Sequence, residues 1–367
     1  MATLGPMLKQ LSESVNSSIA AVSTLIAIKS IGYFIGTIGG GRVFDRFKGH
    51  KIMMVCIGGM ALMMALIPLA RTIIVLGIIM FFLGLFEGFV DVGGNTMTMW
   101  FFHGNLAPFM NTLHLCFGLG AFLSPIIIAN FIDVENSLRW TYWTMALLFL
   151  LSIIGFARLP SPEPLKIAED KKSKQQNFPI IALLAFLFFA YVGAELTFGN
   201  WIFTYAFESG LATEVTATYL NSTFWGAFAL GRLISIPVGK KLSPEQILVI
   251  DMLGSIVSIG AIVVAQSNPV ILWVASITLG LFMASTFPTL LIYAEKRFHI
   301  TGSLTSWFVG SAGAASVIIP YIMTNLYKVH GIKMVPYTLF IVMFLAVVIL
   351  FVMLLVARQI HDQQNQS

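Results

Sequence analysis

The chain has 367 residues, of which 57% are hydrophobic and only 10% are Asp, Glu, Lys or Arg. Soluble domains carry roughly 25% charged residues, and a globule of this size has too little interior to bury so much apolar surface. The composition therefore excludes a soluble enzyme and predicts a polytopic membrane protein. The net charge of +5 is uninformative until the positions of the basic residues are considered.

Eleven apolar stretches are long enough to cross a bilayer as helices, which takes about 20 residues each. In chain order they are 19–40, 52–70, 72–100, 108–132, 139–157, 179–206, 214–237, 246–266, 269–294, 303–326 and 335–357. Their apolar character is continuous rather than alternating, which is typical of helices and not of barrel strands. The sequence thus predicts an all-α membrane protein.

The basic residues are divided unevenly between the two sets of loops. Fifteen of them fall in one set, namely Arg42, Arg46, Lys48, Lys51, Arg158, Lys166, Lys171, Lys172, Lys174, Arg232, Lys240, Lys241, Lys296, Arg297 and Arg358. The opposite set holds five, Lys9, Arg71, Arg139, Lys328 and Lys333. Because cytoplasmic loops are enriched in Lys and Arg, we expect the first set and the C-terminus to lie in the cytoplasm.

The longest polar interruption, 159–177, is predicted to be a cytoplasmic linker between two bundles. The N-terminal bundle would span 1–158 and the C-terminal bundle 178–358, followed by a cytoplasmic tail at 359–367. This division predicts two helical bundles of similar size.

The two bundles resemble each other in sequence. The aligned pairs are Gly32 with Gly231, Gly84 with Gly280, Gly120 with Gly313, and Pro125 with Pro320. Their offsets lie between 193 and 199, which indicates a duplication. At an offset of 199 the partner of 179–206 would begin upstream of Met1. We therefore expect eleven of twelve helices, in a truncated or alternative-start form that lacks most of helix one; the alternative is a true eleven-helix protein.

Six plus six helices around a charged central loop resemble the layout of the major facilitator superfamily. The segment Gly41–Lys51, GRVFDRFKGHK, is similar to the signature cytoplasmic loop of that superfamily. Before it runs a stripe of small residues that lets helices approach closely, Gly32, Gly36 and Gly40. We expect Gly41, Asp45 and Arg46 to form a gate, because the two charges could make and break ion pairs.

Ionisable side chains inside the spans are few, and each costs at least ~2.5 kcal/mol at mid-membrane. The clear cases are Lys29, Glu87, Asp91 and Glu195. A rise of about 1.5 Å per residue places all four near or above the midplane. That is the depth at which alternating-access carriers bind substrate.

Glu87, Asp91 and Asn95 are spaced four residues apart and so form one polar stripe on a helix. The second-half equivalents are the apolar Met283, Phe287 and Leu291. This asymmetry favours a function over a structural requirement of the bundle. We predict that Asp91, with Glu87, binds a cation or substrate; the alternative is a buried ion pair of either carboxylate with Lys29.

Glu195, Asn200 and Trp201 lie together on the first helix of the second half. Ring faces stack on the C–H surface of sugars, while carboxylate and amide groups bind hydroxyls. These residues, with Asn95 and His114, are the predicted substrate site. Trp201 could instead be an ordinary interfacial aromatic residue, and His114 could merely bond to nearby backbone.

Three strings are more specific than the loop motif: Asp91–Asn95, Pro108–Pro125 and Tyr191–Ala206. They closely resemble the sodium-dependent glucose transporter branch and the major facilitator domain-containing protein 4 group, and more distantly the fucose permeases. The resemblance implies hexose uptake at the plasma membrane, coupled to sodium or a proton. In the fucose permeases a carboxylate on the fourth helix carries the coupling proton, and Asp91 stands at the matching position.

The partners expected from this resemblance are a small-molecule sugar, sodium or a proton, and the lipid bilayer, with no nucleic acid. No cofactor is expected apart from a bound sodium ion. The sequence contains no metal-ligand cluster and no GxSxG elbow, so an enzyme is not predicted. The alternative function is that of an inactive truncated isoform with a sensor or regulatory role.

Overall fold

The computed structural model describes residues 3–102, 106–132, 134–158, 178–264, 267–297 and 302–366. Within these ranges every regular element is a helix. The chain divides into two compact units, residues 1–168 and 169–367, which are considered separately. The predicted linker at 159–177 lies outside the described residues.

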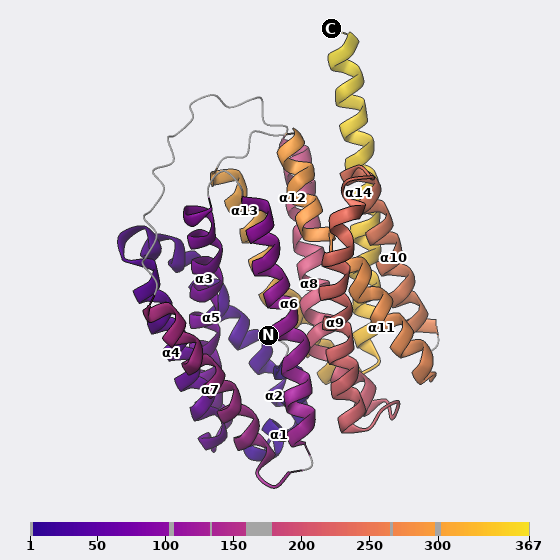
Figure 1. The fold of residues 1–367 in the computed structure, drawn as a ribbon. Coiled ribbons are helices and arrows are strands. Elements are labelled where there is room, and N and C mark those ends of the chain that lie inside the picture. Colours follow the sequence, from indigo (N-terminus) through magenta and orange to yellow (C-terminus); the bar gives the residue numbers. More distant parts are fainter. Residues whose placement is uncertain are drawn as a thin grey trace. The chain divides into compact units, whose positions relative to one another are not determined.

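The first unit contains seven α-helices and one 3-10 helix among the described residues (Figure 1). They are α1 (Leu4–Ser14), α2 (Ile19–Val22), α3 (Thr24–Arg46), α4 (Gly49–Leu66), η1 (Ile67–Leu69), α5 (Ile73–Phe101), α6 (Leu106–Phe131) and α7 (Ser137–Ala157). The most extensive packing in this unit joins α3 to α5 and α4 to α7.

The second unit contains a further seven α-helices in the described part of the chain. They are α8 (Phe178–Glu208), α9 (Glu214–Val238), α10 (Pro244–Val264), α11 (Pro269–Met283), α12 (Thr286–Arg297), α13 (Gly302–His330) and α14 (Met334–Gln366). Here α8 packs against α13 and α14, as α1 packs against α6 and α7 in the first unit. Likewise α9 packs against α11, as α3 packs against α5.

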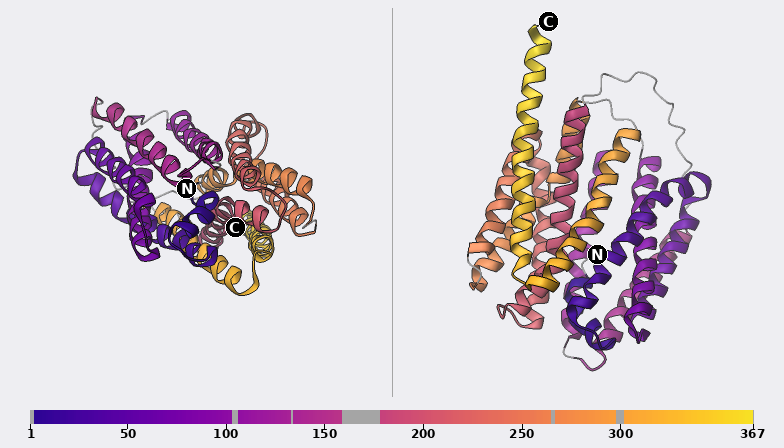
Figure 2. Two further views of the ribbon diagram at one scale, coloured as in Figure 1. Left: turned by 90° about the horizontal axis from the view of Figure 1, so that it is seen from below. Right: turned by 180° about the vertical axis from the view of Figure 1, so that it is seen from behind.

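Each of the eleven predicted spans coincides with one helix or with consecutive helices. Nine helical segments of the described chain are long and apolar enough to cross a membrane. The segments α9 and α13 are not among these nine. The last helix, α14, continues to Gln366, beyond the predicted span at 335–357, and is seen end to end in Figure 2.

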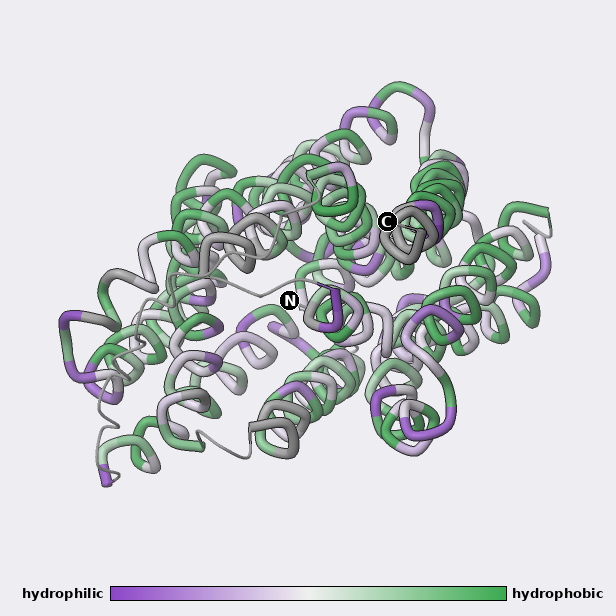
Figure 3. The backbone as a smooth tube through the Cα atoms, turned by 90° about the horizontal axis from the view of Figure 1, so that it is seen from above, coloured by the Kyte–Doolittle hydropathy of each residue, from purple (hydrophilic) through white to green (hydrophobic). Residues whose placement is uncertain are grey.

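The outer faces of the helices carry large apolar side chains. Ile74 is 73% exposed, Val257 is 70% exposed and Val264 is 87% exposed. Figure 3 shows that hydrophobic residues prevail along the helices and that hydrophilic residues gather at many of the turns. Such a surface is stable against lipid rather than water, so the chain is a multi-pass membrane protein.

Glycine allows the two repeat-related helix pairs to pack backbone against backbone. A Cβ atom at Gly84 of α5 would lie 2.0 Å from the carbonyl oxygen of Lys29 in α3. A Cβ atom at Gly280 of α11 would lie 2.5 Å from the carbonyl oxygen of Phe224 in α9. The two glycines, which are equivalent in the sequence repeat, therefore allow the same close contact between helix backbones in both units.

Aromatic residues form much of the core of the second unit. Phe188 of α8 stacks on Phe308 of α13, with ring centroids 5.2 Å apart, and meets the ring of Phe287 edge-on at 5.1 Å. In the first unit Phe44 packs with Met53 and Trp100. These buried contacts hold α8 against α12 and α13, and α3 against α4 and α5.

The predicted single span at 269–294 is divided into α11 and α12. Pro288 has no backbone N–H to donate to the carbonyl of Ala284, so the helix loses a hydrogen bond there. The break falls at Ala284 and Ser285, between the two helices. The apolar pattern alone did not reveal this break, because hydropathy is continuous across it.

Candidate functional site

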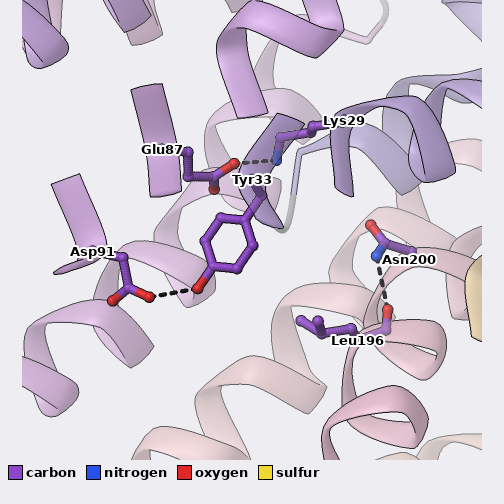
Figure 4. Close-up of polar contacts among 6 residues, drawn as sticks. All are labelled: Lys29, Tyr33, Glu87, Asp91, Leu196 and Asn200. Atoms are coloured by element: carbon purple, nitrogen blue, oxygen red, sulfur yellow. Dashed lines mark hydrogen bonds and ion pairs between the residues drawn. The ribbon is translucent and has the colours of Figure 1, made fainter. Parts of the chain in front are cut away.

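Two pairs of polar side chains connect α3 to α5, like two rungs of a ladder (Figure 4). In the first rung, Nζ of Lys29 lies 2.6 Å from Oε2 of Glu87. The Lys29 side chain is 12% exposed and the Glu87 side chain is 16% exposed. Because most of both groups is removed from solvent, this pair is held in surroundings where an unpaired charge would be costly.

The second rung lies one helical turn further along both helices. Oη of Tyr33 donates a hydrogen bond of 2.5 Å to Oδ2 of Asp91. Asn95 donates from Nδ2 to the other carboxylate oxygen of Asp91, at 3.2 Å, and to its backbone carbonyl, at 3.0 Å. Unlike Glu87, Asp91 is an exposed residue and is held by uncharged donors.

The glycines of α3 and α5 determine which side chains meet across the helix pair. Gly84 lies against the carbonyl of Lys29, and Gly88, one turn later, lies against the carbonyl of Tyr33. Glu87 and Asp91 each follow one of these glycines by three residues. The regular spacing of glycines therefore aligns both rungs, since each helix repeats its faces every three to four residues.

The predicted substrate residues Glu195, Asn200 and Trp201 all lie on α8, in the second unit. Glu195 is buried, with 8% exposed, and Tyr191 and Arg232 are its electrostatic neighbours. Nδ2 of Asn200 donates to the carbonyl of Leu196 in the same helix, at 2.8 Å (Figure 4). This bond leaves the side-chain carbonyl oxygen of Asn200 to accept from another group.

Trp201 is fully buried in this structure. Its ring meets that of Tyr327 from α13 edge-on, with centroids 5.0 Å apart. Tyr327 in turn donates to Glu208 at 2.6 Å. The indole N–H of Trp201 has no hydrogen-bond partner among the described residues. A buried hydrogen-bond donor is therefore available next to this aromatic contact.

The remaining predicted residues belong to the first unit. His114 lies on α6 and is partly buried. Of the gate residues, Gly41 lies at the end of α3 with open space where a Cβ would be, and Arg46 is exposed. The side chain of Asp45 lies outside the described part of the structure, so its role in a gate stays a prediction.

Asp251 was missed by the sequence analysis, although it lies inside the predicted span at 246–266. It is 6% exposed on α10, and Oγ of Ser285 donates to its Oδ2 at 2.5 Å. Ser285 stands at the break between α11 and α12. An acidic residue within an apolar run was the available signal, but only the fold shows that its partner lies at the interrupted helix.

No three His, Cys, Asp or Glu side chains of the described ranges are grouped closely enough to hold a metal ion. At Asp91 the neighbouring polar atoms are the hydroxyl oxygen of Tyr33 and the amide nitrogen of Asn95, and both donate to the carboxylate. The carboxylate oxygens are the atoms of this group that can accept a proton or a cation.

Comparison with known proteins identifies relatives over nearly the whole chain. Sodium-dependent glucose transporter 1 of Homo sapiens is 28% identical, over 92% of this chain and 73% of that protein. Sodium-dependent glucose transporter 1A of Mus musculus is 28% identical, over 88% of this chain and 85% of that protein. Major facilitator superfamily domain-containing protein 4A of Homo sapiens is 24% identical, over 90% and 84% respectively.

A solved structure supports the same assignment at the level of the fold. A mutant of the nucleoside transporter NupG superposes with a TM-score of 0.74 at 13% identity, over 96% of this chain and 94% of that one. Residues 1–320 match the family model described as Major Facilitator Superfamily. The predicted major facilitator fold is thereby confirmed, and this chain belongs to the major facilitator superfamily of secondary transporters.

Proposed function

We propose that this protein moves a hexose across the plasma membrane by alternating access, driven by a cation, with sodium preferred over a proton. The relatives named sodium-dependent glucose transporter 1 and 1A support this choice of substrate and ion.

The observation that carries the proposal is the exposure of the Asp91 carboxylate and the identity of its hydrogen-bond partners. Its carboxylate lies deep within α5, is exposed, and is bound by Tyr33 and Asn95 rather than by a cationic side chain. A carboxylate at that depth is costly unless it has a partner or a function. A transported cation that binds and leaves in each cycle provides a partner that is only transiently present.

The residues proposed to bind the sugar are Glu195, Asn200 and Trp201 on α8, and Asn95 and His114 on α5 and α6. In this conformation Trp201 is buried against Tyr327. Alternating access requires the site to open in only part of the transport cycle. In that open state, a sugar ring would replace Tyr327 as the group in contact with the ring of Trp201.

The excess of Lys and Arg in one set of loops places the C-terminus in the cytoplasm in this proposal. The segment with Gly41, Asp45 and Arg46 then lies at the cytoplasmic end of α3. There it would act as a gate, because its charges can pair in one state and separate in the other.

The test is uptake of labelled glucose by the chain reconstituted into liposomes, under an inward sodium gradient, an inward proton gradient or neither. We expect accumulation with sodium, and its loss in Asp91→Asn with sugar exchange retained. The control is Glu245→Gln, which neutralises a partly exposed carboxylate at the start of α10. Absence of uptake under every gradient would favour the non-transporting alternative, and full accumulation by Asp91→Asn would exclude Asp91 as the coupling site.

A further inference from the structure

A polar stripe on α10, in the second unit, takes no part in the proposed function. It consists of Asp251, Ser255 and Ser258, which are spaced four and three residues apart and so share one face of the helix. All three are buried, with 6%, 1% and 4% exposed respectively. A carboxylate and two hydroxyl groups on one face of an apolar span need partners, because unpaired polar groups are costly there.

Two hydrogen bonds between helices show that this α10 stripe faces α11 and the break that follows it. Oγ of Ser285, at the break, donates to Oδ2 of Asp251 at 2.5 Å. Seven residues further along α10 and seven residues back along the facing helix, the hydroxyl groups of Ser258 and Thr278 are 2.8 Å apart. Ser255 lies between these two contacts on the same face, so its side chain is also directed toward the helix that contains the break.

The hydroxyl group of Ser255 is the unsatisfied member of the stripe. Its Oγ is buried and has no hydrogen-bond partner among the described residues. A serine within a helix commonly avoids this cost by bonding to a carbonyl of the preceding turn. Ser276, a buried serine on α11, does so by donating to the carbonyl of Leu272 at 2.7 Å. The unused hydroxyl of Ser255 therefore indicates a ligand rather than ordinary packing.

The break between α11 and α12 adds further oxygen atoms beside Asp251. Thr286, the first residue of α12, is the second hydroxyl side chain that bonds to this carboxylate, and it is 2% exposed. The hydroxyl oxygens of Ser285 and Thr286 keep lone pairs after donating their hydrogens. The carbonyl of Ala284 has lost its usual helical donor, because Pro288 has no N–H. Carbonyl groups at interrupted membrane helices are suited to sodium.

We propose that these oxygen atoms form a binding site for one alkali-metal cation, with sodium as the probe, between the α10 stripe and the break. Its side-chain ligands are Asp251, Ser255, Ser285 and Thr286. One carboxylate balances one positive charge, whereas Ca²⁺ takes about six to eight oxygen ligands and commonly several carboxylates. The cation would hold α10 to both sides of the interrupted helix, and the site does not depend on Asp91.

The cationic side chains of the surrounding helices are engaged or directed elsewhere. The helices α11, α12 and α14 pack on α10. The first of these contains no Lys or Arg, and the described cationic residues of the other two are exposed, namely Lys296, Arg297 and Arg358. From α8, Tyr191 is an electrostatic neighbour of Asp251, and Arg232 of α9 acts on Tyr191 and Glu195. Within the described residues, Asp251 is thus bonded by hydroxyl groups, and a bound cation would supply its counter-charge.

Ser255→Ala distinguishes a cation ligand from a serine that is merely buried. Removing an unpartnered hydroxyl should leave the thermal unfolding midpoint in choline chloride unchanged or slightly higher. If the hydroxyl binds sodium, the sodium concentration that gives half of the stabilisation should rise at least tenfold. The matched control is Ser276→Ala, which should lower the midpoint in both salts and keep the full response to sodium.

Asp251→Asn tests the charged ligand of the site. The substitution keeps the size of the side chain and removes the negative charge, so sodium should no longer raise the unfolding midpoint. Ser285 and Thr286 can still donate to the amide oxygen, which keeps the contact between α10 and the break.

The experiment measures the thermal unfolding midpoint of the purified full chain in sodium, potassium or choline chloride, at equal ionic strength and constant pH. The Asp91→Asn protein is the background, because it lacks the proposed coupling carboxylate. We expect saturating sodium to raise its midpoint by at least about 2 °C, and this rise to disappear when Asp251→Asn is added. If Asp91→Asn cannot be purified, the parent should show two saturable components, of which Asp251→Asn removes one.

The site is refuted if sodium does not stabilise the Asp91→Asn protein, or if the stabilisation survives Asp251→Asn. A midpoint that responds to pH in the same way in sodium and choline would show instead that Asp251 holds a proton. The proposed function fails separately, through uptake that ignores the sodium gradient, and that result would leave the thermal response intact.

Discussion

Tyr33 and Asp91, which are 58 residues apart in the sequence, are joined by a hydrogen bond of 2.5 Å from the phenol to the carboxylate. One turn away, Lys29 and Glu87 form the same kind of connection between the same two helices. In both cases α3 supplies the donor and α5 the acid. The Asp91 carboxylate thus accepts a hydrogen bond from a side chain of α3, and glycines bring the backbones of α3 and α5 into close contact.

Replacing Tyr33 by Phe should weaken cation binding without unfolding the protein. The change removes a hydrogen bond to a charged group, worth about 1.5–3 kcal/mol, and leaves the ring in place. We expect the sodium concentration for half-maximal uptake to rise about tenfold, which corresponds to roughly 1.4 kcal/mol. Titration of uptake against sodium measures this, and Tyr321→Phe, at a site 60% exposed on α13, is the control. An unchanged sodium titration would mean that the phenol does not tune Asp91.

The Gly84→Ala substitution should separate α3 from α5. Its Cβ would lie 2.0 Å from the carbonyl oxygen of Lys29, and this neighbour is backbone that cannot swing aside. Overpacking costs about 1–3 kcal/mol or more, which exceeds the gain of about 1 kcal/mol expected when Ala replaces Gly in a helix. We therefore expect a lower thermal unfolding midpoint and loss of sodium-driven uptake.

The matched control for that substitution is Gly94→Ala on the same helix. There the nearest atom to an added Cβ belongs to the Leu113 side chain, at an ordinary 3.8 Å. The helix propensity gain should then prevail, and stability should be unchanged or slightly increased. Equal destabilisation by both substitutions would show that close helix contact is not the reason for glycine at position 84.

Removing the hydroxyl group of Ser285 should destabilise the break between α11 and α12. Asp251 is buried on α10 and accepts a hydrogen bond from Ser285. Because a buried polar group that loses its partner costs about 1–3 kcal/mol, Ser285→Ala should lower the unfolding midpoint. The loss should be smaller when Asp251→Asn is already present, since a neutral amide is less costly to leave unpaired.

A thermal melt of the four proteins in this double-mutant cycle measures the coupling of the two residues. Ser235→Ala serves as a control, because the Ser235 hydroxyl donates to the carbonyl of Arg232 in its own helix. Additive effects at positions 251 and 285 would contradict a direct interaction.

The ion pair between Glu245 and Arg297 should contribute little to stability. Its charged atoms are 3.4 Å apart, and the two side chains are 36% and 33% exposed. Pairs exposed to this extent are worth about 0–1 kcal/mol. We expect Glu245→Gln to shift the unfolding midpoint by no more than its replicate error at physiological salt. A large shift would mean that the contact between the start of α10 and the end of α12 contributes substantially to the stability of the fold.

Much of the site's composition was predictable from residues that are conspicuous in apolar surroundings. Lys29, Glu87, Asp91 and Glu195 were identified because charge within a span is expensive. Tyr33 was not, since a tyrosine in such a span looks like any aromatic residue until its partner is known. Asp251 was overlooked beside these four, and its significance arises from its hydrogen bond with Ser285, at the break between α11 and α12.

The sequence by itself determined the helical architecture, the duplication and the family resemblance, because each depends on the order of residues along one chain. Continuous apolar runs specify membrane helices, and repeated glycines mark where helices can touch. Only the tertiary structure decided that Lys29 pairs with Glu87, that Tyr33 holds Asp91, and that the helix after Met283 is broken. The physical reason is that hydropathy reports burial of a segment as a whole, whereas hydrogen bonds and ion pairs depend on rotation and register between helices distant in the chain.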